Sequence, residues 1–509
     1  MSTTFIHREQ TTNAPSVGAR GWVALAVLML PVLLVSVDNT VLAFALPSIS
    51  SSIGPTGAQQ LWIVDIYPLV LAGLLVSMGS MGDRFGRRRL LLIGATGFAA
   101  VSVLAAYAPT PEALIAARAV LGFFGAMIMP PTLSLIRNIF LEPNQRRLAI
   151  AVWAACFAAG GALGPIVGGF LLEHFWWGSV FLLAVVVLIP LLILAPIFVP
   201  ESKDPNPGPV DPTSILLSLV ALAPIVYAVK NLAHGGPLGQ TVIPAAVGVV
   251  ASILFVRRQL QRDIPMLDVR LFRVPTFSGA VAVNLLSVFS LVGFLFFTSQ
   301  HLQLVVGLSP MQAGVALLPG LALTVAVGLA VVPLVRHVKP WIVVVIALSM
   351  SSLGYLTVLA FVSPTSTTAI VVAFALLGAG IGAAETISND MIVSSVAPEK
   401  AGAASAVSET AYELGAVLGT AVLGSILMAA YRAHLTVPAG VDDAAASLAA
   451  ETLGGAHHVA TGLPAAEGSA LLDSAHAAFD TGVVFTSGIG AVLMVVSAGV
   501  AYATLRPRA

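Results

Sequence analysis

Long apolar runs alternate with short polar breaks along the whole chain. Most runs reach about 20 residues, the length that a helix needs to cross the hydrocarbon core of a bilayer. Helices are expected in these runs, because a segment in lipid must satisfy its own backbone polar groups. The pattern predicts fourteen spans, near 22–46, 61–81, 90–108, 113–136, 147–172, 179–199, 212–231, 241–256, 275–299, 311–335, 341–362, 367–391, 402–430 and 481–505.

Composition also predicts an integral membrane protein. Of the 509 residues, 58% are hydrophobic and 9% are charged, whereas a soluble domain carries about 25% charged residues. The 23 basic and 23 acidic residues balance, so charge gives no indication of a nucleic-acid partner. Cys156 is the single cysteine, which excludes an intrachain disulfide. No Gly-x-x-x-x-Gly-Lys-Ser/Thr loop occurs, so ATP drive is not expected in this chain. Neither a cofactor nor a metal is expected.

Basic residues are distributed asymmetrically between the two sides of the predicted spans. If the N-terminus is cytoplasmic, every Lys and Arg except Arg118, Lys230 and Arg432 falls on that side. Cytoplasmic loops carry an excess of Lys and Arg. Both termini are therefore predicted to be cytoplasmic, which agrees with an even number of spans.

Two connections are long. Residues 257–275 are basic and amphipathic, which suits a segment lying along the cytoplasmic membrane surface. Residues 431–480 are external, rich in Ala and Gly, and mostly acidic in their charged positions. A solvated acidic loop is the favoured interpretation of this segment. The alternative is a helical hairpin that caps the external mouth and attracts cations.

Asp38 lies well inside the first apolar run. A carboxylate there raises the free energy by at least roughly 2.5 kcal/mol, so it needs a partner, a water-filled cavity or a proton. Arg118 in the fourth span likewise must be paired or hydrated, and its simplest role is a structural ion pair. Intramembrane acids usually mark ion or substrate pathways, so Asp38 is a candidate for proton coupling and for binding. The alternative is an acid satisfied by a neighbouring helix.

A second acidic cluster occupies the thirteenth span, where Glu409 and Glu413 share one helix face. Two nearby carboxylates in a low dielectric resist joint ionisation, which suits proton carriage as well as cation binding. The alternative is a structural pair bonded to polar neighbours. Tyr412 adds an aromatic face for a planar cation. Glu385 and Asp390 in the twelfth span are further binding candidates, although Asp390 is near enough to the cytoplasmic end to be an interfacial cap.

Two motifs rich in small residues predict close helix packing. The loop after the second span carries Gly79, Asp83, Arg84, Gly86 and Arg87. Its small residues let helix ends approach, and Asp83 can hold one helix arrangement by charge pairing. The fifth span carries Gly160, Gly164, Pro165, Gly168 and Gly169. Small residues four apart give a smooth packing face, and Pro165 removes a backbone hydrogen bond and allows a kink.

These motifs resemble those of the major facilitator superfamily. Residues 79–89 are similar to its loop motif, 118–122 to its buried-arginine motif, and 160–169 to the antiporter motif found in exporters. Residues 38–47 and 62–67 resemble the first- and second-span signatures of fourteen-span drug:proton antiporters. The likeness covers nearly the whole chain, and is greatest to mycobacterial-type exporters of dyes and fluoroquinolones. It implies that Arg118 serves proton coupling and that Asp65 and Tyr67 contribute to binding.

The resemblance implies an all-α major facilitator fold with two six-helix lobes and two additional central helices. The expected parts are a cytoplasmic tail (1–21), an N-terminal lobe (22–199), two inserted spans with a basic linker (200–274), a C-terminal lobe including the external loop (275–505), and a cytoplasmic tail (506–509). The binding site should lie between the lobes near the midplane, with alternating access by rocking.

The expected function is proton-coupled export of lipophilic cations across a bacterial plasma membrane, by a monomer and without enzymatic activity. Quaternary ammonium compounds and ethidium-like dyes are the expected cargo. One alternative keeps the fold but exports a lipid, peptide or metabolite. Another is a membrane sensor or scaffold that moves no substrate.

Overall fold

The computed structural model describes residues 17–203, 211–233, 236–263, 265, 267–361, 367–396 and 401–507. Most of the predicted N-terminal tail and the last two residues lie outside this part of the chain. The described residues form helices and contain no strand. Thirteen of these helices are long and apolar enough to cross a membrane, and α6 makes fourteen when its two bent halves count as one span. The predicted all-α, fourteen-span architecture is confirmed.

The helices form two bundles with a separate pair between them in sequence. The N-terminal bundle comprises α1 (Ala19–Ile53), α2 (Gly57–Phe85), α3 (Arg87–Ala106), α4 (Pro111–Ala126), α5 (Met129–Ile139), α6 (Pro143–His174) and α7 (Ser179–Phe198). The inserted pair is α8 (Pro212–Ala233) and α9 (Leu238–Gln261), followed by the short 3₁₀ helix η1 (Val269–Arg273). The C-terminal bundle comprises α10 (Pro275–Gln300), the π-helix η2 (His301–Val305), α11 (Pro310–Leu334), α12 (Pro340–Phe361), α13 (Thr367–Ser394), α14 (Ala401–Gly419), the π-helix η4 (Thr420–Gly424), α15 (Ser425–His434), α16 (Asp443–Glu451), α17 (Leu453–Thr461) and α18 (Ala465–Leu505).

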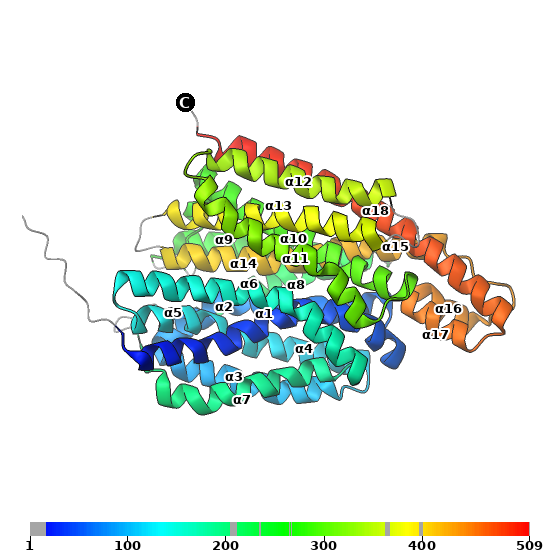
Figure 1. Ribbon diagram of the computed structural model, residues 1–509, viewed down its shortest axis with the longest axis horizontal. Coiled ribbons are helices and arrows are strands. Elements are labelled where there is room, and N and C mark those ends of the chain that lie inside the picture. Colours follow the sequence, from blue (N-terminus) through cyan, green and yellow to red (C-terminus); the bar gives the residue numbers. More distant parts are fainter. Residues whose placement is uncertain are drawn as a thin grey trace, which may run out of the picture.

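Each bundle has its own hydrophobic core. Phe98 and Phe181 are buried in the N-terminal bundle, whereas Phe294 and Phe374 stack in the C-terminal bundle with ring centroids 5.6 Å apart. Figure 1 shows the N-terminal bundle, which runs from blue to blue-green, lying alongside the C-terminal bundle, which runs from green to red. The start of α1 and the end of α18 lie at one end of the molecule, here called the terminal end. Helices α16 and α17 lie at the opposite end, here called the hairpin end.

Several prolines lie inside spanning helices, and for one in α1 and one in α6 another helix donates a hydrogen bond to the carbonyl that the proline leaves free. Pro47 lies inside α1, which continues to Ile53 instead of ending near residue 46 as expected. The carbonyl of Ala43, four residues earlier, accepts a hydrogen bond from Ser299 Oγ of α10 at 2.9 Å. A proline is tolerated in a membrane helix when the freed carbonyl finds such a donor. This hydrogen bond also connects the two bundles.

Pro165 has a similar effect within α6. The segments Leu148–Gly161 and Leu163–His174 are bent by 41° relative to each other, which agrees with the predicted kink. The Gly161 carbonyl, four residues before the proline, accepts a hydrogen bond from Thr40 Oγ1 of α1 at 3.1 Å. Gly164 has no Cβ, and an added one would lie within 1.9 Å of the Thr40 hydroxyl. The glycine is therefore required for the threonine to reach the carbonyl.

The inserted pair is closed at the terminal end by an ion pair. Arg258 donates hydrogen bonds from Nε and Nη2 to Asp211 at 2.9 and 2.8 Å. These bonds hold the pKa of Asp211 well below its ordinary value. Helix α9 exposes apolar side chains such as Ile243 and Val250, as expected of a helix that faces lipid. Helix α8 packs against α2 and against α15, so it contacts both bundles.

The favoured expectation of a solvated loop at 431–480 is wrong. Helices α16 and α17 form a hairpin whose residues Ala449, Leu453 and Ala456 are buried. Each of the two helices begins at a side-chain cap, at Asp442 and at Thr452. Alanine favours helix over loop, and the caps satisfy free backbone N–H groups. These local signals outweighed the acidic, glycine-containing character on which the expectation rested.

Candidate functional site

The two charges predicted in the first and fourth spans form a buried ion pair. Asp38 on α1 is 8% exposed and Arg118 on α4 is 2% exposed. Arg118 Nη1 lies 2.8 Å from Asp38 Oδ2, and Arg118 Nε donates to the Ile63 carbonyl at 3.2 Å. The guanidinium also lies 4.6 Å from the centre of the Tyr67 ring. Asp38 therefore has the partner that an intramembrane acid requires.

A second buried ion pair joins the N-terminal bundle to the inserted helices. Lys230 Nζ of α8 lies 2.8 Å from Asp65 Oδ2 of α2, and the two residues are 2% and 0% exposed. The ammonium also lies 4.0 Å from the centre of the Trp62 ring. Lys230 was not predicted as a site residue. The available signal was that it is one of the few basic residues outside the positive side of the spans, and it lies at the edge of an apolar run.

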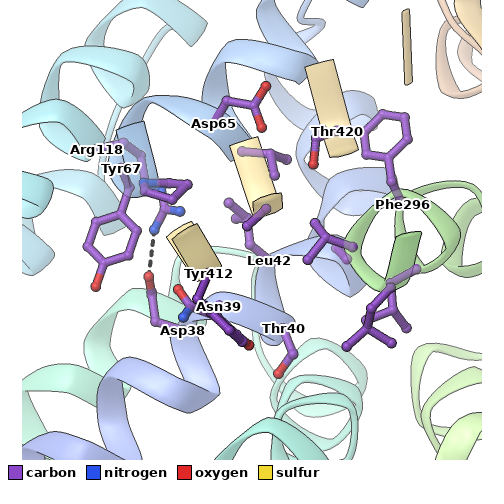
Figure 2. A pocket seen from close by; sticks show the side chains of 17 residues that line it. Asp38, Asn39, Thr40, Leu42, Asp65, Tyr67, Arg118, Phe296, Tyr412 and Thr420 are labelled. Atoms are coloured by element: carbon purple, nitrogen blue, oxygen red, sulfur yellow. Dashed lines mark hydrogen bonds and ion pairs between the residues drawn. The ribbon is translucent and has the colours of Figure 1, made fainter. Parts of the chain in front are cut away.

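A cavity of about 50 Å³ lies between the bundles. Its lining includes predicted site residues from both bundles: Asp38, Asp65, Tyr67, Arg118 and Tyr412. In Figure 2, Asp38 and Arg118 form one ion pair, while Asp65 lies apart from them beside Thr420 of η4. A cavity of this size holds a few water molecules and is too small for a dye. The bundles must separate around it before a large molecule can enter.

Glu409 and Glu413 of the C-terminal bundle differ from Asp38 and Asp65 of the N-terminal bundle in having no ion-pair partner among the described residues. Glu409 and Glu413 lie on α14, as predicted, and Glu413 is 6% exposed. Glu413 is close enough to Glu409 and to Asp38 of the other bundle to interact with both charges. An unpaired carboxylate in a low-dielectric site is stabilised by a proton or by a bound cation. Neither glutamate lines the cavity in this conformation.

The acids become more exposed toward the terminal end. Glu413 is buried, Glu409 and Glu385 are half-buried, and Asp390 is exposed. Asp390 lies one turn before the end of α13 and does not line the cavity, in keeping with the interfacial alternative. Glu385 also lies outside the cavity lining, although its charge reaches Tyr412.

The glycine motif of α6 supports two different helix contacts. Gly160, Gly164 and Gly168 face α1 of the same bundle, where added Cβ atoms would meet Ser36, Thr40 and Val41. Gly169 instead faces α11 of the other bundle. A Cβ there would lie 2.6 Å from Met311 Cα, and a Cβ added to Gly314 of α11 would lie 2.5 Å from the Pro165 carbonyl oxygen. The motif thus packs one bundle internally and brings the two bundles together toward the hairpin end.

The loop motif between α2 and α3 forms contacts within the N-terminal bundle. Arg87 Nη2 lies 2.7 Å from Asp83 Oδ1, so the predicted charge pairing of Asp83 is local. Glu201 accepts hydrogen bonds from the backbone N–H groups of Arg88 and Arg89 at 3.0 and 3.1 Å. Gly86 has a φ of +113° and lies so close that a Cβ would be 2.9 Å from the Glu201 carboxylate. Among the remaining motif residues, Arg84 is exposed and Gly79 faces Pro130 of α5.

Comparisons with known proteins agree with this architecture. Residues 28–420 match the family model of the Major Facilitator Superfamily. The chain is 56% identical over 500 residues to the multidrug efflux pump LfrA of Mycolicibacterium smegmatis, covering 98% of this chain and 99% of that protein. It is 36% identical over 482 residues to the methyl viologen resistance protein SmvA of Salmonella typhimurium, covering 94% and 97%.

Solved structures show the same fold. A crystal structure of a bacterial homolog to the human lysosomal transporter Spinster superposes with a TM-score of 0.64 at 18% identity, covering 97% of this chain and 98% of that one. The helical architecture, the family model and the relatives identify the same family. The chain belongs to the major facilitator superfamily as a multi-pass membrane transporter, and the two relatives are named as an efflux pump and a resistance protein and not as enzymes.

Proposed function

We propose that the protein exports lipophilic cations across the bacterial plasma membrane in exchange for protons, with both termini in the cytoplasm. The cargo class includes quaternary ammonium compounds, ethidium-like dyes and fluoroquinolones. The two bundles serve as the lobes of an alternating-access transporter. The observation that carries the proposal is that the acids lining the cavity are paired with basic residues, whereas Glu409 and Glu413 of α14, outside that lining, have no such partner among the described residues.

The N-terminal acids around the cavity already have internal cations. Asp38 is paired with Arg118, and Asp65 is paired with Lys230. In the part of the chain that the structure describes, Glu409 and Glu413 have no such pair. Protons and organic cations satisfy the same carboxylate by opposite means, one by neutralising it and the other by pairing with it. Competition between the two at this cluster is the basis of an exchange cycle.

The exposure of the acids supports loading from the cytoplasm. With the terminal end on the cytoplasmic side, Asp390, Glu409 and Glu413 form a series of decreasing exposure from that side toward the cavity. Such a series concentrates cations along the route. The relatives point the same way: one is named for multidrug efflux and another for resistance to methyl viologen, which is an organic dication.

The test is ethidium efflux from cells that produce the full chain. Energised cells should expel the dye, and a protonophore should abolish expulsion within the time needed to collapse the gradient. Depletion of ATP with the proton gradient maintained by respiration should leave efflux intact. Efflux that follows ATP and not the gradient would contradict proton coupling, and no effect on any lipophilic cation would favour a lipid, peptide or metabolite as cargo.

Gly169→Val tests whether closure of the bundles at the hairpin end is part of the cycle. The new side chain would meet the backbone of Met311 and Pro310. Overpacking of this kind typically costs about 1–3 kcal/mol, which lowers the population of the closed arrangement about fivefold to hundredfold. We expect dye efflux to fall by a comparable factor while dye binding in detergent is retained.

Gly499→Val is the matched control, because it lies on α18 with no atom near its missing Cβ. It should transport normally. Equal loss of binding and efflux in Gly169→Val would mean that the glycine maintains the fold and not the cycle.

A further inference from the structure

We propose that Lys230 is an internal competitor of the transported cation: its ammonium occupies Asp65 in the empty transporter, and a cationic substrate displaces it. The inserted helices would thereby take part in selecting cargo. This inference rests on the proposed function, since it requires that cations are the cargo.

The groups around the Lys230 ammonium are of the kinds that bind organic cations. They combine a carboxylate oxygen at 2.8 Å with the face of an indole ring at 4.0 Å. Indole is the best aromatic partner for a cation, and the interaction strengthens when the site is desolvated. Both members of the ion pair are buried, at 2% and 0% exposure. Lys230 thus occupies a site whose chemistry suits a lipophilic ammonium compound equally well.

This site is continuous with the cavity between the bundles. Asp65 is part of the cavity lining, whereas Lys230 is not among the lining residues. When the bundles separate and the cavity widens, the carboxylate would therefore become accessible from the cavity side while Lys230 holds it from α8. One carboxylate cannot pair fully with Lys230 and with a second cation at the same time. A cation in the cavity therefore weakens the contact between Lys230 and Asp65. Neutral and anionic molecules have no means of displacing it.

Helix α8 contacts both bundles at the place where they meet. A small hydrophobic cluster joins Leu69 of α2, Val226 of α8, Val417 of α14 and Ala421 of η4. The inserted helix thus packs at the seam where α2 and α14 of opposite bundles meet. Thr420, beside Asp65, is the first residue of the π-helix η4, and short π-helical segments frequently occur at functional sites. Separation of α2 from α14 must change the surroundings of the ion pair.

The test is ethidium binding to the purified full chain, measured by fluorescence polarisation. Lys230→Met keeps an apolar stem but removes the ammonium, so Asp65 is always available to the dye. If Asp65 is free of Lys230 for about a tenth of the time, the dye should bind about tenfold more tightly to this variant. Asp65→Asn should weaken binding. The double variant should bind like Asp65→Asn, because the proposed competition takes place at the Asp65 carboxylate.

Arg258→Met is the matched control. It removes a basic residue of α9 that pairs with Asp211 just before the start of α8, 19 positions before Lys230 in the chain. It should leave dye affinity unchanged. Unchanged or weaker binding by Lys230→Met would overturn the proposal. Recovery of wild-type affinity in the double variant would instead show that the pair is structural.

Thermal unfolding with and without ethidium distinguishes a competing lysine from a structural ion pair even if Lys230→Met lowers the stability of the fold. An internal competitor predicts that saturating ethidium raises the Tm of Lys230→Met more than that of the wild type, because the dye pairs with the exposed carboxylate charge. A structural pair predicts a lowered Tm that the dye does not restore. Loss of ethidium binding and efflux in the wild type would instead refute the proposed function itself.

Discussion

Asp38→Asn is expected to abolish cation efflux. The substitution keeps the shape of the side chain but removes the only carboxylate that pairs with Arg118 in the described structure. Breaking a buried ion pair on one side destabilises a protein by about 3–5 kcal/mol, because the remaining charge is buried without compensation. The variant therefore loses a titratable group at the cavity and also leaves a cation there that repels the cargo. Ethidium efflux normalised to protein in the membrane is the measurement.

Two further variants separate charge from stability. Asp38→Asn combined with Arg118→Gln removes both charges, so the folded protein should recover stability while efflux remains absent. Asp38→Glu retains the charge and should keep part of the activity. Wild-type efflux by a well-expressed Asp38→Asn variant would show that the first-span acid is structural.

The second large effect concerns Glu409 and Glu413. Protons and cationic dyes compete for these carboxylates, so the apparent affinity for ethidium should rise as pH rises from about 5 to about 9. Glu409→Gln and Glu413→Gln should each flatten that dependence. Because coupled sites titrate as a pair, the double variant should lose little more than the more severe single variant. Dye binding to purified protein across the pH range is the measurement.

The groups facing Glu413 define the controls for that experiment. Its charge interacts with Glu409 on the same helix and with Asp38 on α1, and Asp38 is held by Arg118. Glu385→Gln tests the half-buried acid of α13 that lies near Tyr412. Flat affinity in the wild type, or independent effects of the two substitutions, would assign proton coupling to Asp38 and not to the glutamate pair.

The sequence was sufficient to predict the fold class and individual candidates, but not how candidates pair. Asp38 and Arg118 were each recognisable as costly intramembrane charges, yet they are 80 residues apart in the chain, and helical periodicity gives no information about contacts between helices. Lys230 lies at the edge of an apolar run, where a lysine can extend to the interface. Its burial could therefore be predicted only if the position of α2 were known. The end of the first span was also predicted wrongly. Helix α1 continues past Pro47, and the donor to the carbonyl that this proline leaves free is Ser299, which lies on the other bundle.

The α16–α17 hairpin has a kinetic consequence. It belongs to the C-terminal bundle in sequence, and Tyr431 Oη donates to the Ala449 carbonyl at 2.9 Å. It also rests on the N-terminal bundle, where the backbone N–H of Gly57 donates to Glu451 Oε2 at 3.1 Å and Gly454 approaches Ser50. Parting the bundles at this end must break the second set of contacts. A hydrogen bond to a charged group contributes about 1.5–3 kcal/mol, so its rupture alone can slow opening by roughly tenfold or more. We therefore expect the hairpin to slow turnover, and changes in it to alter the rate of transport more than the choice of transported molecule.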